Sequence, residues 1–78
     1  MSPTVFREDG FRFYFFSREE SRMHVHVQCA DGEAKFWLEP IAVAFRTGYA
    51  DHEIRRIESL VAQNLEVLLD AWKRVHDR

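Results

Sequence analysis

The sequence predicts an α+β fold in which an antiparallel sheet of four or five strands, built from β-hairpins, packs against one long C-terminal helix. Two observations lead to this prediction. Up to Gly48, runs of aromatic and β-branched residues are interrupted by Asp-Gly pairs, a pattern typical of hairpins. Beyond Gly48 there is no Gly or Pro, and apolar residues recur every three or four positions, as in an amphipathic helix. We therefore expect residues 1–47 to form the sheet and residues 51–76 the helix.

The length of 78 residues allows one domain, which we expect to span residues 1–78. A hydrophobic fraction of 46% excludes a disordered chain, and no apolar run approaches the roughly 18 residues that cross a membrane. The single cysteine, Cys29, excludes an internal disulfide framework and a cysteine-rich zinc site. Because the N-terminus lacks the layout of a signal peptide, we expect a cytoplasmic protein with no membrane partner.

Two tight turns are predicted from Asp-Gly pairs, at residues 9–10 and at residues 31–32. Asp and Gly tolerate the positive φ of a type I′ turn, so the first pair predicts a two-residue hairpin turn. A two-residue turn at the second pair would place His26 opposite Trp37 and fix which side chains share a face. Residues 18–22 are polar and are expected to connect the two hairpins.

The alternation of side chains along the strands gives the sheet an apolar face and a mixed face. The apolar face is expected to carry Phe11, Phe13, Phe15, Val25, Val27, Cys29, Ala34, Phe36 and Leu38. The opposite face, which we name the outer face, is expected to carry Arg12, Tyr14, Phe16, His24, His26, Gln28, Lys35 and Trp37.

The segment after Pro40 has two interpretations. Pro40 cannot donate a ladder hydrogen bond, so it ends the preceding strand. Residues 41–45 then alternate large and small side chains, which favours a short edge strand. The alternative is a short helix that begins at Pro40 and ends at Gly48.

The predicted helix has more apolar surface than one small sheet covers. About 25 residues at about 1.5 Å each span about 38 Å, and the apolar arc is about 160° wide where about 100° suffices for a single contact. We therefore expect a homodimer or a partner groove. Asp51, or the stretch of residues 50–53, is expected to supply oxygen atoms and negative charge for the first turn. Asn64 lies within the apolar stripe, where its amide either bonds to a strand end or sets one dimer register.

The outer face is the predicted binding surface because it mixes aromatic rings with cations. Its candidate residues are Arg12, Tyr14, Phe16, His24, His26, Lys35 and Trp37. Such a mixture suits single-stranded nucleic acid, whose bases stack on rings, and it is equally typical of protein interfaces. The formal net charge of −2 favours a small partner protein over RNA, because nucleic-acid affinity depends mainly on basic charge.

His24 and His26 are the candidate catalytic residues, for a small ribonuclease in which an imidazole acts as acid or base. They lie two residues apart in a strand and leave the same face. Two nitrogens do not complete a zinc site, so we expect no metal and no cofactor. The interpretation we favour places both rings against Trp37 and Tyr14, in a binding module rather than an enzyme.

Several segments resemble a bacterial family known as domain of unknown function 4160. They are residues 3–5 (PTV), 11–17 (FRFYFFS), 24–27 (HVHV), 32–38 (GEAKFWL) and 68–72 (LLDAW). The resemblance implies a tiny stand-alone protein of bacteria or phages, often encoded beside another small protein, and one component of a toxin–antitoxin-like pair. It assigns no catalytic residue. Arg22 and Met23 stand where members of the family commonly have two prolines, so the entry into the following strand is expected to differ.

Overall fold

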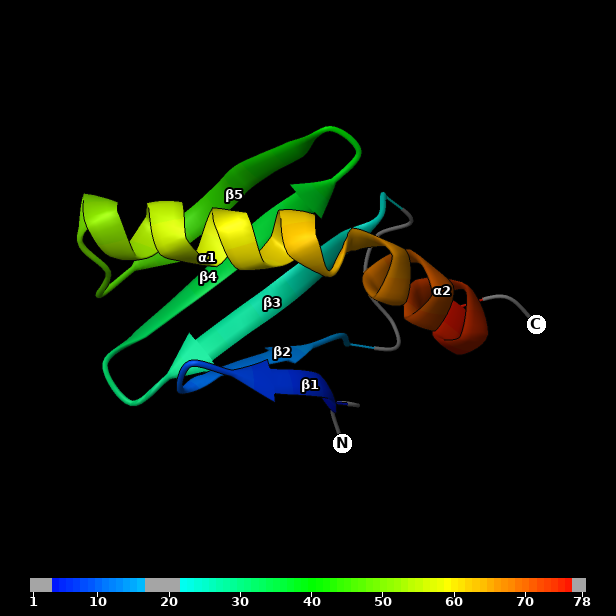
Figure 1. Ribbon diagram of the computed structural model, residues 1–78, viewed down its shortest axis with the longest axis horizontal. Helices are drawn as coiled ribbons and strands as arrows, with labels where there is room; N and C mark the ends of the chain where they lie inside the picture. Colours follow the sequence, from blue (N-terminus) through cyan, green and yellow to red (C-terminus); the bar gives the residue numbers. More distant parts are fainter. Residues whose placement is uncertain (1–3, 17–21, 77–78) are drawn as a thin grey trace.

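The computed structural model describes residues 4–16 and 22–76. Five antiparallel strands form one sheet in the order β1-β2-β3-β4-β5, so that strands adjacent in sequence are also adjacent in space. The elements are β1 (Thr4–Glu8), β2 (Phe11–Tyr14), β3 (His24–Cys29), β4 (Gly32–Leu38), β5 (Ile41–Thr47), α1 (Asp51–Gln63) and α2 (Leu65–His76). Helix α1 crosses one face of the sheet, and α2 lies at the end where β2 stops and β3 begins (Figure 1). The predicted α+β class and antiparallel sheet are confirmed.

The first hairpin has the predicted turn. Glu8 lies opposite Phe11, and Asp9 and Gly10 between them have φ values of 55° and 83°. Positive φ at both central residues is the requirement of a type I′ turn. The predicted connection at residues 18–22 lies mostly outside the described residues, which resume at Arg22.

The second hairpin turns one residue earlier than predicted, which shifts its pairing register by two residues. Its turn is Ala30 and Asp31, Gly32 pairs with Cys29, and His26 therefore lies opposite Lys35 rather than Trp37. Because the register differs by two residues and side chains alternate with a period of two, the predicted faces are unchanged.

Gly32 is a strand residue because of what packs against it. A Cβ atom built there would lie 2.8 Å from the Thr47 carbonyl oxygen and 2.9 Å from the Tyr49 ring. The Tyr49 hydroxyl donates a hydrogen bond of 3.1 Å to the Gly32 carbonyl. Gly32 thus provides close approach for Tyr49 and does not form the turn.

The segment after Pro40 is a strand, and the helical alternative is wrong. β5 pairs with β4 along its length, with one extra residue, Ala44, bulged between the partners of Lys35 and Phe36. Gly48, with a φ of 80°, then reverses the chain toward α1. The first turn of α1 is stabilised by the Glu53 carboxylate, which accepts a 2.9 Å hydrogen bond from the Ala50 amide.

The prediction of one long helix is wrong, because the helix breaks at Asn64 (φ −111°, ψ 19°). The Asn64 amide donates to the Leu60 carbonyl at 2.8 Å and to the Glu8 carboxylate, at the end of β1, at 3.4 Å. It therefore bonds to a strand end, the first of its two predicted roles. The break turns α2 along the end of the sheet, so the length of the helix no longer argues for a dimer.

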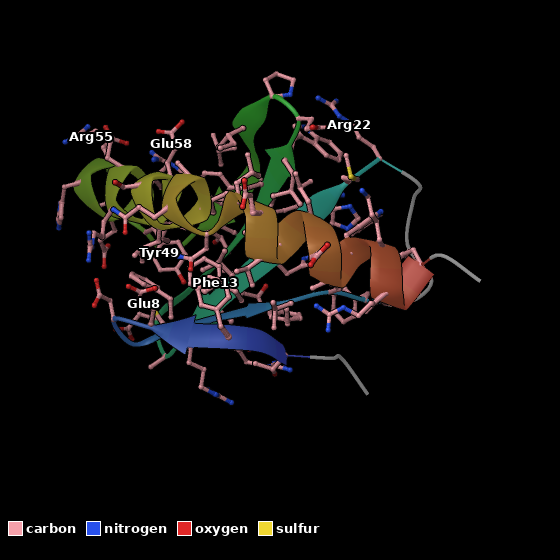
Figure 2. All side chains as sticks on the ribbon, turned by 45° about the vertical axis from the view of Figure 1, so that its right-hand side comes forward. Glu8, Phe13, Arg22, Tyr49, Arg55 and Glu58 are labelled. Carbon is pink, nitrogen blue, oxygen red and sulfur yellow. The ribbon has the colours of Figure 1, made fainter. Side chains whose placement is uncertain are left out.

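The core lies between the apolar face and the two helices. Its fully buried hydrophobic side chains are Phe13, Phe15, Val25, Val27, Phe36, Leu38, Ile57, Leu60, Val61 and Leu68. Figure 2 shows Phe13 and Tyr49 between the sheet and α1. Among residues 4–16 and 22–76, neither helix is long and apolar enough to cross a lipid bilayer.

Candidate binding surface

Strand register arranges the outer face in three rows that run across the sheet. The first row contains Arg7, Arg12, Gln28, Glu33 and Thr47. The second contains Thr4, Tyr14, His26, Lys35 and Phe45, and the third contains His24, Trp37 and Ala42. The Phe16 ring joins this face through contacts with the rings of Tyr14 and His26. All seven predicted surface residues are therefore brought together on one face.

Two aromatic rings of this face are covered by cations of the same chain. The Arg12 guanidinium lies 4.3 Å from the centre of the Tyr14 ring, and the His26 ring is stacked on the same ring at 5.3 Å. Arg22 and Lys35 lie 4.2 and 4.7 Å from the centre of the Trp37 ring. Because Tyr14 is also buried, an incoming planar group cannot stack on its ring.

His24 is fully buried, although it lies on the outer face by register. Its Nδ1 lies 2.7 Å from the Arg22 carbonyl oxygen, so Nδ1–H is the donor in this contact. Its ring packs edge-on against Trp37 and, at 5.0 Å, against Trp72 of α2. Burial beneath α2 removes His24 from contact with a substrate, which argues against the catalytic hypothesis for this residue.

His26 packs against neighbouring rings, as the favoured interpretation expects, although register now places it opposite Lys35. Its imidazole is half-buried between Tyr14 and Phe16. In the described part of the chain, no three His, Cys, Asp or Glu side chains are grouped so that they could hold a metal ion.

A groove of about 390 Å³ runs over the middle of the outer face. It is lined by Tyr14, Phe16, His26, Glu33, Ala34, Lys35 and Phe45. Phe16 and Phe45 are its exposed rings, with 39% and 54% of their surfaces accessible. Phe45 could not be assigned to this face from the sequence, because the face of residues 41–45 depends on the bulge at Ala44, which the local pattern does not reveal.

The outer face is positively charged although the whole chain has a net charge of −2. Within the three rows the cations are Arg7, Arg12 and Lys35, against the single carboxylate of Glu33, a difference of +2, and Arg22 lies over the Trp37 ring of the same face. Figure 2 places Arg22 beside the start of β3. A local field of this sign attracts acidic groups even when the chain as a whole is acidic.

Comparison with known protein families gives one match, over residues 10–73, to the family described as "Domain of unknown function (DUF4160)". The match covers most of the chain, so the chain belongs to this family, as the resemblance indicated. Neither the curated proteins nor the solved structures contain a match to the chain.

Proposed function

We propose that this member of the DUF4160 family is a protein-interaction module whose outer face binds a small partner protein. The observation that carries the proposal is the groove of about 390 Å³ in which the exposed rings of Phe16 and Phe45 accompany Lys35. Aromatic side chains beside cations, in a groove from which a bound partner excludes water, are typical hot spots of protein interfaces. The positive charge of the face favours a partner with acidic as well as apolar side chains.

The partner that we propose is the product of a neighbouring gene, in a bacterial or phage gene pair of the toxin–antitoxin type. Acidic chemistry on that partner would complement Arg12, Arg22 and Lys35. Burial of His24, one of the two candidate catalytic histidines, against the Trp72 ring favours a binding module over an enzyme.

RNA binding is the second candidate, and the clustering of cations on aromatic rings favours it. Base stacking needs open ring faces. Here Arg12 and His26 cover the buried Tyr14, and Arg22 and Lys35 lie over Trp37, so a base would have to displace the protein's own cations. A protein partner makes no such demand, since its side chains would pack against the exposed Phe16 and Phe45.

The test co-expresses the chain with the product of the adjacent reading frame and measures their affinity by titration calorimetry. We expect Phe16→Ala to weaken the complex by about 2 kcal/mol or more, the usual cost of removing a hot-spot aromatic side chain. The matched control is Val67→Ala on α2, which removes another exposed apolar side chain (52% accessible) and should leave the affinity unchanged.

Labelled single-stranded RNA is titrated in parallel at low and at moderate salt. A dissociation constant below about 1 μM that rises steeply with salt would replace the protein proposal with RNA binding, because salt displaces phosphate contacts. A complex with the adjacent gene product that is equally tight for the wild type, Phe16→Ala and Val67→Ala would place the interface elsewhere.

A further inference from the structure

We infer that β5 is a strand-addition site, at which a second copy of this chain extends the sheet by antiparallel pairing with its own β5. β5 is the last strand of the sheet, so within the described residues only one of its two edges has a strand neighbour. The free edge of a strand presents N–H and C=O groups that another strand can pair. The inferred occupant differs from the partner of the proposed function, although both would contact Phe45.

The bulge at Ala44 gives the edge an apolar side chain on each face. Val43 lies opposite Phe36 and is directed to the helix side, whereas Phe45 lies opposite Lys35 and is directed to the outer face. Their accessible fractions are 45% and 54%, among the largest for the hydrophobic side chains described. An added strand would cover both.

A hollow reaches β5 on each face of the sheet. The outer hollow is the groove that contains Phe45 and Lys35. On the helix side, Ile41 and four residues of α1 line a second hollow of about 440 Å³. Two of these, Arg55 and Glu58, project from α1 on the side where β5 lies (Figures 1 and 2). Strand addition works in this way in general, with main-chain bonds along the edge and alternate side chains in flanking pockets.

The chemistry of the helix-side hollow fits an uncharged strand. It contains one cation and one carboxylate, Arg55 and Glu58. A charged strand would therefore be desolvated without a net counter-charge.

β5 is itself a strand with almost no charge. Its sequence, IAVAFRT, contains one charged residue, Arg46, and this guanidinium is paired at 2.5 Å with Asp51 of the same chain. The other edge of the sheet, β1, carries Arg7 and Glu8 and is less suited to enter the hollows. In a two-fold dimer the same patch supplies both strand and hollow, so β5 pairing with β5 satisfies both copies at once.

Sedimentation velocity between about 1 and 100 μM tests the dimer. Because pairing of one short strand buries little surface, we expect a dissociation constant in the micromolar range. Val43→Lys places two like charges near the two-fold axis and should weaken the dimer at least tenfold. Val67→Lys is the matched control, since it adds the same charge at an equally exposed valine on α2 and should leave the dimer intact.

Hydrogen exchange of the wild type gives a second measurement that does not depend on any variant folding. We expect the outward amides of β5 to become more protected as concentration rises, while those of β1 do not. A monomer throughout the concentration range, or equal effects of the two lysine variants, would overturn the inference. Protection of β5 that appears only on adding the adjacent gene product would overturn it too, and would assign the edge to a foreign strand.

Discussion

At the level of single residues, the corner between Gly32 and Tyr49 connects the sheet to α1. Tyr49 is buried, its hydroxyl donates to the Gly32 carbonyl, and its ring packs edge-on against Phe11. Burial raises the pKa of the Tyr49 phenol above its usual range, and the nearby Cys29 side chain adds to the rise. The neutral, protonated phenol is therefore the form that the folded protein accommodates.

This corner predicts how stability depends on alkaline pH. The folded protein keeps the Tyr49 proton at pH values where an unfolded tyrosine, with a pKa of about 10, loses it. Stability is therefore complete below about pH 10 and falls as the pH rises further. Tyr49→Phe should cost about 1 kcal/mol at neutral pH, through the lost hydrogen bond, and should flatten the alkaline decline. Urea unfolding at pH 7 to 11 measures both, and parallel curves for wild type and variant would contradict the assignment.

At the level of elements, Asn64 decides where the helix ends. Its side-chain amide donates hydrogen bonds to the Leu60 carbonyl and to the Glu8 carboxylate, and the second bond connects the helix break to β1. Asn64→Ala should lower stability by about 1 kcal/mol despite the higher helix propensity of alanine, because both contacts are lost. This corresponds to roughly 4–8 °C in melting temperature for a domain of this size. Gln63→Ala, at an exposed neighbour, is the control, and an equal shift for both variants would show that the two contacts contribute nothing.

The elements that could be predicted are those with local causes. The turn at residues 9–10, the strand after Pro40 and the two faces of the sheet follow from positive φ, ladder donors and alternation. The break at Asn64 could not be predicted, since its cause is a contact with Glu8, distant in sequence; a polar residue within an apolar stripe was the one available signal. The predicted register of the second hairpin was wrong for a similar reason. Gly32 is required for the close approach of the Tyr49 ring and not for the turn.

The sequence predicts which residues lie on the candidate surface but not which of them are exposed. All seven residues lie on the outer face, yet His24 is buried because α2 brings Trp72 against it. One straight helix would not have reached this end of the sheet, so the expectation of a long helix and the expectation of an available His24 failed together. The burial of His24 beneath α2 thus results from tertiary packing, which cannot be predicted from the alternation of side chains along a strand.

At the level of the whole molecule, charge is divided between two sides. A net charge of −2 combined with a difference of +2 in the three rows of the outer face requires an excess of acidic groups elsewhere in the chain. Association with an acidic partner is then steered by the outer face and opposed by the remaining surface. Such steering acts mainly on the association rate and weakens as salt screens the charges.

The steering can be measured by stopped-flow association with the adjacent gene product at about 20 and 200 mM salt, which differ severalfold in screening. Lys35→Ala should slow association at low salt and reduce its salt dependence. The half-buried Lys35 lines the groove, and its ammonium lies over the Trp37 ring. Lys73→Ala, which removes the same charge from the exposed surface of α2, should leave the rate nearly unchanged. If both variants slow association equally, the net charge governs the encounter, and the outer face has no special part in it.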